Sequence, residues 1–203
     1  MFRNSLMAAA AMIVFGSGAA LAQGAPGGET WQFQCPAAGT TVEQSSGAAL
    51  RYRAAAAAPA TCNVGGQPRL LGYWSVREGF FQAGGARLAA AFSQGVDLNR
   101  MEPVTFEYFG PNRFAISTHY QETWRAAPGG AVTTPAGTFD TVKVTRDFQV
   151  IGAVFSYTQS VWFDRATNAP VQARVEHLNP VQASTLVNWV ATDVSRRQAT
   201  AAR

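Results

Sequence analysis

Apolar and polar residues alternate with a period of two along most of the chain from residue 103 onward. In the first such stretch, Val104, Phe106 and Tyr108 alternate with Thr105 and Glu107. A second stretch follows over residues 114–124, with its apolar positions at Phe114, Ile116, Tyr120 and Trp124. Successive side chains of a strand point to opposite faces, so this pattern predicts an antiparallel sheet with one buried and one wet face.

The register of one hairpin can be predicted around residues 150–155. Gly152 and Ala153 are expected to form a two-residue turn, with glycine first as a type II′ turn prefers. Pairing outward from that turn groups the apolar residues on one face, as Val150–Phe155, Phe148–Tyr157, Val144–Val161 and Val142–Phe163. The other face receives Asp147–Thr158, Thr145–Ser160 and Lys143–Trp162. A slip of one residue would destroy this sorting.

The remaining elements complete a mainly β fold. Two more strands are expected at 171–178 and 181–194, giving an antiparallel meander of at least five strands. Weaker strand signals lie at 31–35, 40–44, 50–53 and 69–76, and the alanine-rich segment 54–60 is interpreted as a surface loop. One helix is predicted at 86–92, and it is too short to cover the apolar face. We therefore expect a curved sheet or a partly open barrel or sandwich, with part of its face either closed by the N-terminal strands or left as a groove.

Composition and charge narrow the class of protein. The chain has 203 residues, of which 47% are hydrophobic and 14% charged, which excludes a disordered chain. Its net charge of +4 is spread without a long basic run. Nucleic-acid binders usually concentrate positive charge on one face, so no nucleic-acid partner is expected.

Residues 1–22 have the pattern of a secretory signal peptide. Arg3 precedes an apolar core at 6–15, and Ala20-Leu21-Ala22 forms a small-x-small cleavage site. The core is too short to span a bilayer comfortably, and Gln23 stands where a lipoprotein would need cysteine. These features predict a periplasmic or secreted protein that is soluble after cleavage, with no integral membrane segment in the mature chain. A single β-rich domain is expected over 23–194 and a disordered tail over 195–203.

The two cysteines, Cys35 and Cys62, are expected to form a disulfide, because an even count in an oxidising compartment favours one. It could stabilise the fold by roughly 3–4 kcal/mol. No CxxC motif occurs, and a metal site would need more ligands at suitable spacing. No metal and no cofactor are expected.

The sequence shows no set of residues that matches a known catalytic site. The mature chain lacks the Gly-x-Ser-x-Gly elbow of serine hydrolases. His119 lies on the polar face of its predicted strand, where a histidine is ordinarily solvated. Glu102 and Glu107 have opposite parity, so their side chains would not converge if both lay on one strand. We therefore predict that the protein is not an enzyme.

Four polar residues interrupt the apolar face, one on each of four successive strands: Glu122, Arg146, Gln159 and His177. The hairpin register places Arg146 opposite Gln159, and a five-residue turn at 166–170 places Gln159 opposite His177 unless that register slips by two. Buried polar groups need partners, so this row can be internally satisfied, with Glu122 neutralising Arg146, or lie at a barrel rim. Alternatively, it can be the polar anchor of a pocket that binds an apolar ligand.

Residues 132–144 (Val-Thr-Thr-Pro-Ala-Gly-Thr-Phe-Asp-Thr-Val-Lys-Val) resemble the PAGTFDT-x-K-V hairpin of bacterial exported domains of unknown function. Trp162-Phe163-Asp164 and Asn168-Ala169-Pro170-Val171 match the segments that follow it there, so the resemblance spans residues 100–194. Some such domains are similar to the curved sheet around a helix of periplasmic lipoprotein carriers of the Lol type. That similarity implies a hydrophobic cavity and contact with lipid or lipoprotein, and it supplies no catalytic residues. This chain departs from it in having one short helix and no lipobox.

These observations favour a non-enzymatic exported envelope protein that acts as a binding or interaction module for a protein partner or an apolar ligand. The alternative is a periplasmic carrier of a lipid or another apolar ligand. A carrier would leave an apolar cavity of ligand size, whereas an interaction module would pack its sheet shut. An enzyme would instead show a cleft in which His119 or His177 meets a carboxylate and a nucleophile.

Overall fold

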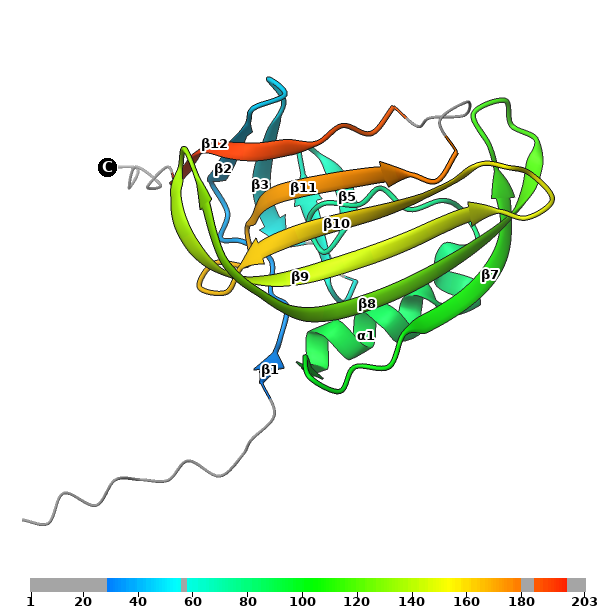
Figure 1. Ribbon diagram of the computed structural model, residues 1–203, viewed down its shortest axis with the longest axis horizontal. Helices are drawn as coiled ribbons and strands as arrows, with labels where there is room; N and C mark the ends of the chain where they lie inside the picture. Colours follow the sequence, from blue (N-terminus) through cyan, green and yellow to red (C-terminus); the bar gives the residue numbers. More distant parts are fainter. Residues whose placement is uncertain (1–28, 56–57, 180–184, 197–203) are drawn as a thin grey trace, which may run out of the picture.

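Ten strands join into one antiparallel sheet that curves around the helix α1 (Figure 1). The computed structural model describes residues 29–55, 58–179 and 185–196. Within them the edge strands β5 and β7 do not pair with each other, so the sheet is open, and the predicted mainly β fold is confirmed. The strands in sheet order are β5 (Gln67–Leu70), β4 (Thr61–Val64), β3 (Ala49–Ala55), β2 (Thr40–Gln44), β12 (Trp189–Arg196), β11 (Pro170–His177), β10 (Ser156–Asp164), β9 (Gly137–Val150), β8 (Ser117–Thr134) and β7 (Val104–Pro111).

The predicted register of the β9–β10 hairpin is confirmed, from Gln149 opposite Ser156 to Val142 opposite Phe163. The two-residue turn predicted for this hairpin is wrong. The ladder ends at Gln149 and Ser156, followed by one bond from the Val150 N–H to the Phe155 carbonyl, and the Ile151 N–H bonds to the His119 carbonyl of β8. Because Ile151 is held by the neighbouring strand, residues 151–154 form a longer loop with Gly152 at φ +81°.

The connections of the meander also differ from the prediction at two places. Phe114 and Ile116 do not lie on the buried face, because the chain turns over residues 112–116 and exposes both side chains. The last strand begins only at Trp189, and residues 181–184 of its predicted range lie outside the described residues. It continues through Ser195 and Arg196, which pair with Thr41 and Thr40, so these two residues belong to the sheet and not to a tail.

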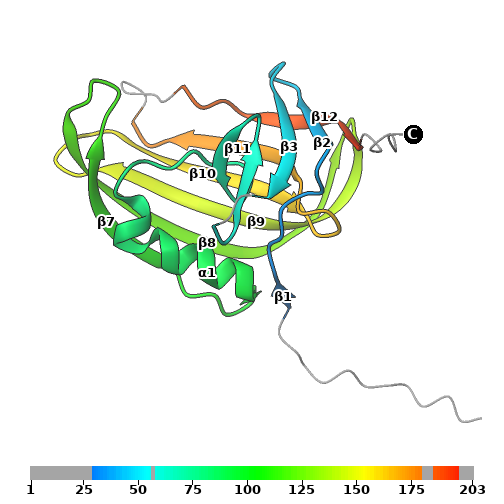
Figure 2. The ribbon, with the colours of Figure 1, turned by 180° about the vertical axis from the view of Figure 1, so that it is seen from behind.

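The N-terminal strands continue the sheet beyond β12 and curl over its concave face (Figure 2). Strands β2 and β3 match the prediction, whereas β4 was missed. The strand predicted at 69–76 is interrupted, because Leu71 and Gly72 adopt positive φ and reverse the chain. The strand predicted at 31–35 is reduced to β1 (Thr30–Trp31), which pairs with β6 (Val96–Asp97).

The helix and the disulfide occur where they were predicted. Helix α1 (Ala86–Gln94) buries Leu88, Ala89 and Phe92 and ends at Gly95, after the π-helical turn η1 (Phe81–Gly85). A side chain at Gly85 would lie 2.1 Å from the Phe80 ring, so this glycine serves packing. The Cys35–Cys62 disulfide, with its Cα atoms 5.5 Å apart, ties the segment before β2 to β4.

Candidate functional site: a buried polar row

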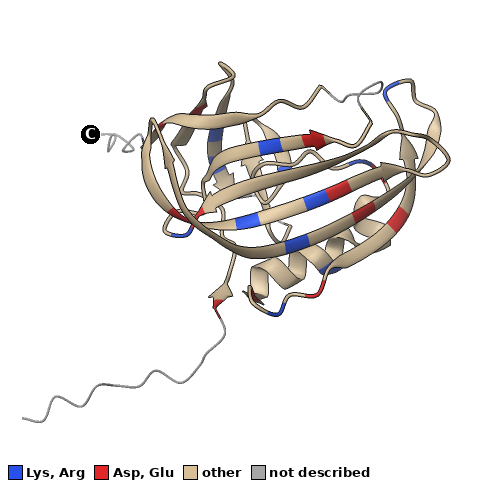
Figure 3. Cartoon of the chain, viewed as in Figure 1, with Lys and Arg blue, Asp and Glu red and all other residues tan. Residues whose placement is uncertain are grey.

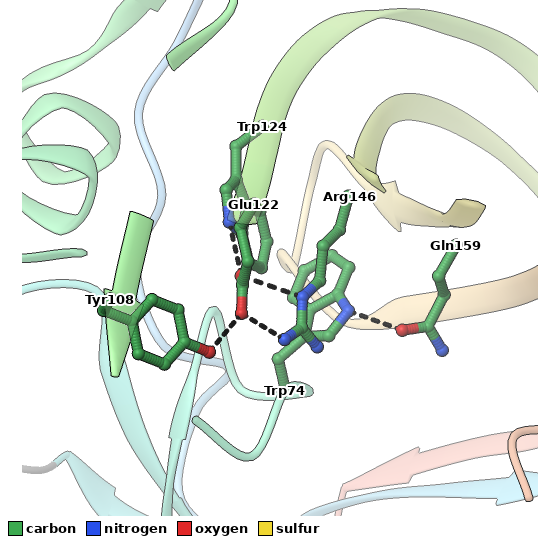
Figure 4. A network of polar contacts seen from close by, with 6 residues as sticks. All are labelled: Trp74, Tyr108, Glu122, Trp124, Arg146 and Gln159. Atoms are coloured by element: carbon green, nitrogen blue, oxygen red, sulfur yellow. Dashed lines mark hydrogen bonds and ion pairs between the residues drawn. The ribbon is translucent and has the colours of Figure 1, made fainter. Parts of the chain in front are cut away.

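Glu122 and Arg146 form an ion pair in the interior of the curved sheet, and their side chains are 0% and 4% exposed. The Arg146 Nε donates to Glu122 Oε2 at 2.9 Å and its Nη2 to Oε1 at 2.5 Å. The Tyr108 hydroxyl donates to Oε1 at 2.6 Å, and the Trp124 indole N–H to Oε2 at 2.8 Å (Figure 4). A carboxylate offers about four acceptor positions, so Glu122 is saturated.

Strand parity and register explain why these residues meet. On β8 and β9, Trp124 lies opposite Arg146 and Glu122 lies opposite Phe148, so Glu122 and Arg146 are diagonal neighbours on the concave face. Diagonal neighbours are within reach of long side chains. The guanidinium also lies 4.9 Å from the Phe148 ring centroid and 5.4 Å from that of Trp124. Two aromatic rings therefore lie close to the guanidinium that Glu122 binds.

Gln159 belongs to a second, adjoining set of hydrogen bonds. It lies opposite Arg146, as predicted, and is 1% exposed. Its Oε1 accepts the Trp74 indole N–H at 2.7 Å (Figure 4), and its Nε2 donates to the Tyr73 hydroxyl at 3.2 Å. The same hydroxyl accepts the Trp189 indole N–H at 3.0 Å. Both ends of the buried amide are thus bonded, as a buried polar group requires.

His177 does not join this row, and its predicted position opposite Gln159 is wrong. Gln159 lies opposite Val175, and His177 lies opposite Tyr157. The turn begins earlier than predicted, because pairing resumes with Phe163 opposite Pro170 and the Asp164 N–H bonds to the Ala169 carbonyl. With the one-residue irregularity between Trp162 and Phe163, the register differs by two from the pairing of Gln159 with His177, which is the slip left open above. Its ring is 6.3 Å from that of Tyr157.

The surroundings of this network alter its titration. Burial raises the pKa of the Tyr108 phenol well above its usual value, and the adjacent Glu122 carboxylate raises it further. Burial also raises the pKa of Tyr157 and Tyr73. Burial alone would lower the pKa of Arg146, but the charge and hydrogen bonds of Glu122, together with Tyr157 and Tyr108, outweigh it, so the pKa of the guanidinium is raised. The network therefore keeps Arg146 charged and the phenols protonated.

Sequence reasoning missed the aromatic partners of the row: Tyr73, Trp74, Tyr108, Trp124 and Trp189. It also missed Arg77, whose guanidinium lies 4.8 Å from the ring centroids of both Tyr120 and Phe148. Tyr108 and Trp124 were recognised only as apolar positions, although buried Tyr and Trp usually find a hydrogen-bond partner. That tendency was the available signal.

His119, considered above as a catalytic candidate, lies away from the row. His119 is on the outer face of the sheet, where its Nε2 is 3.0 Å from Glu107 Oε2 and its ring stacks on Phe109 at 4.4 Å. The neighbouring Thr118 hydroxyl donates to the Ile116 carbonyl and not to the imidazole. Among the described residues, no group of three or more His, Cys, Asp or Glu side chains is placed to hold a metal ion.

Two hollows on the described surface have volumes of about 240 and 390 Å³. One lies between Ser45 and the β11–β12 pair, and the other lies beside the β7–β8 turn. Neither is lined by any of the four residues of the predicted row. In the described part of the chain, no helix has the length and apolar character needed to cross a membrane.

Comparison of the chain with protein-family models, curated proteins and solved structures found no match. Its function is therefore inferred from its own geometry.

Proposed function

We propose that this protein is a non-enzymatic, exported envelope protein that acts as a binding module and engages its partner through its outer surface. The observation that carries this proposal is the filled interior of the sheet. Phe80, Leu88, Phe92 and Trp124 are 0% exposed, and Trp74 is 2% exposed. Small-molecule sites are usually concave, apolar cavities of about 300–1,000 Å³. A sheet whose interior is filled by such large side chains is better suited to be a rigid scaffold than a ligand carrier.

The saturated polar row supports the same proposal. The carboxylate of Glu122 and the amide of Gln159 are both bonded within the protein, so an entering ligand would have to break these bonds to use them. Breaking them leaves buried polar groups unpaired, which is costly. The row is better suited to fixing the positions of β8, β9 and β10 than to anchoring a ligand.

Export to the periplasm is part of this proposal and is supported by the leader pattern of residues 1–22 and by the Cys35–Cys62 disulfide. Disulfides persist mainly in oxidising compartments. The inferred partner is another component of the cell envelope.

Native mass spectrometry of protein recovered from the periplasm, followed by organic extraction, tests the proposal. We expect the mass of the disulfide-bonded chain alone and no stoichiometric lipid in the extract. As a second measurement, protein refolded from urea without lipid should have the same urea midpoint as the periplasmic preparation, because a resident ligand stabilises the folded state. A reproducible bound lipid, lost together with stability on refolding, would overturn the proposal in favour of a carrier.

A further inference from the structure

The large hydrophobic side chains that the described part of the chain exposes lie at one end of the sheet. Strands β7 to β12 form an antiparallel meander, so the β7–β8 and β9–β10 connections lie at the same end as the C-terminus of β11 and the N-terminus of β12 (Figure 1). We call this the apolar end and define it by six residues that are 55–66% exposed: Phe109, Phe114, Ile116, Val154, Leu178 and Val187.

The opposite end of the meander has a different surface. Its β8–β9 and β10–β11 turns expose Pro135, Gly137, Ala166 and Thr167, and none of the exposed large hydrophobic side chains in the described residues lies there. Single exposed apolar residues are normal on protein surfaces. Their concentration on or beside three neighbouring connections, with none at the other end in the described residues, indicates an interaction surface.

The apolar end carries positive charge without acidic residues in its connections. The described residues 112–116, 151–155, 178–179 and 185–188 contain Arg113 and no Asp or Glu, and the β9–β10 loop is uncharged in Figure 3. The Arg113 guanidinium lies 4.7 Å from the Phe114 ring centroid. The nearest carboxylates along the chain, Glu107 and Glu176, belong to the strands behind these connections, and Glu107 contacts His119 and Gln121. From another part of the chain, the exposed Glu78 lines the hollow beside Phe109 and Ala115. The charge that the described connections themselves offer is thus Arg113, beside Phe114, and this cation suits an anionic surface.

The β7–β8 turn also satisfies its own backbone groups. The Asn112 Oδ1 accepts the N–H of Phe114 at 2.8 Å and that of Ile116 at 3.1 Å. The Asn112 N–H bonds to the Ile116 carbonyl, and the Ala115 N–H bonds to the Asn112 carbonyl. An apolar medium offers no partners to backbone donors, so a loop that enters it must bond them internally. This turn can therefore present Phe114 and Ile116 to lipid without leaving these four N–H groups unpaired.

We propose that the apolar end docks onto an anionic lipid bilayer, with Phe114 and Ile116 inserted at the interface and Arg113 beside the lipid phosphates. This inference rests on the proposed binding role and names the partner of the module. A fluid bilayer accepts side chains from three separate connections without a matching shape, whereas a protein partner needs a continuous complementary surface. Arginine beside apolar side chains suits the boundary between headgroups and acyl chains, where its stem is buried and its charge stays wet.

Co-sedimentation with vesicles tests this proposal. Wild-type protein is expected to bind vesicles of phosphatidylcholine mixed with phosphatidylglycerol, more weakly as salt increases. A Phe114→Ser/Ile116→Ser variant should bind about a hundredfold more weakly, since losing each buried side chain costs roughly tenfold. An Arg113→Gln variant should weaken binding severalfold on the anionic vesicles and leave binding to pure phosphatidylcholine unchanged. The matched control is Pro135→Ser in the opposite turn, which should bind like the wild type.

Three results would overturn the proposal: no vesicle binding by the wild type, equal binding by the double serine variant, or a dimer in solution that this variant abolishes. The last result would assign the apolar end to a second copy of the chain. Equal urea midpoints of wild type and variants would show that folding is intact. If vesicle binding fails while the native mass stays free of lipid, the binding module survives with a protein partner. If a resident lipid is found, the proposed function fails whatever the vesicles show.

Discussion

Strands β8 and β9 carry two ion pairs of the same chemistry, one on each face of the sheet. Glu122 and Arg146 meet on the concave face, where their side chains are 0% and 4% exposed. Arg125 and Asp147 meet on the convex face, where their side chains are 47% and 34% exposed. The four residues occupy neighbouring positions of the same ladder, so the surroundings of the two pairs can be compared directly.

The two pairs differ in what would replace a lost partner. Water can solvate Arg125 or Asp147 on the outer face, and Asp147 also accepts a hydrogen bond from the Thr158 hydroxyl at 2.7 Å. Inside the sheet, Glu122 and Arg146 are surrounded by aromatic rings and have only each other, Tyr108 and Trp124 as polar partners in these contacts. On the outer face, either charge can therefore be removed at little cost in stability. On the concave face, removing one charge leaves the other buried without a counter-ion, which is costly.

Removing the buried cation should have the largest effect. Arg146→Met keeps much of the side-chain volume but leaves the Glu122 carboxylate buried without its cation, and we expect a loss of about 3–5 kcal/mol in the free energy of unfolding. Urea denaturation measures this loss. The Glu122→Leu/Arg146→Met double variant removes both charges and should recover part of the stability. A double variant no more stable than Arg146→Met would contradict the interpretation that the uncompensated carboxylate causes the loss.

The next largest effect is expected at Tyr108, whose hydroxyl donates to the buried carboxylate at 2.6 Å. Hydrogen bonds to charged groups contribute about 1.5–3 kcal/mol, so Tyr108→Phe should destabilise the protein by about 2 kcal/mol. In the background of the Glu122→Leu/Arg146→Met double variant the same change should cost nothing, because its acceptor is gone. An equal cost in both backgrounds would show that the hydroxyl acts through something other than Glu122.

Alkaline pH should destabilise the protein through the buried phenols. The pKa values of Tyr52, Tyr73, Tyr108 and Tyr157 are raised in the folded state, chiefly by burial. Their contribution is complete below about pH 10, the ordinary pKa of tyrosine, and decreases above it because only the unfolded chain then releases these protons. Urea midpoints measured from pH 8 upward should show this decline. Tyr108→Phe should reduce its slope by about 1.4 kcal/mol per pH unit, and an unchanged slope would argue against this titration.

The contrast between the two ion pairs was partly predictable from the sequence. Long strands with strict alternation defined the faces, so the parity of Glu122 and Arg146 and the register of Arg146 opposite Gln159 could be predicted. The position of His177 could not, because a slip of two keeps every side chain on the same face, so alternation does not fix where the β10–β11 turn begins.

The donors that complete the buried row were harder to predict. Trp74 reaches Gln159 from a connection that reverses at Leu71, which has φ +48°. The β7–β8 turn, which is not part of the row, has the same feature, because its Ala115 has φ +59°. Residues other than glycine rarely adopt such angles, so the sequence does not indicate these turns. Strand faces follow from local alternation, whereas these connections depend on contacts with distant parts of the chain.

The smallest loss of stability is expected for the exposed ion pair on the outer face. The variant that breaks this pair also serves as the matched control for Arg146→Met. Arg125→Met makes the same substitution as Arg146→Met at the neighbouring ion pair, but leaves Asp147 in contact with water and with the Thr158 hydroxyl. Exposed pairs contribute about 0–1 kcal/mol and are screened by salt, so we expect a loss within that range that disappears in concentrated salt. The loss caused by Arg146→Met should persist there, because salt does not reach the buried pair. Equal losses at the two positions, measured by urea denaturation at low and high salt, would show that loss of arginine packing, and not burial of an unpaired charge, determines the cost.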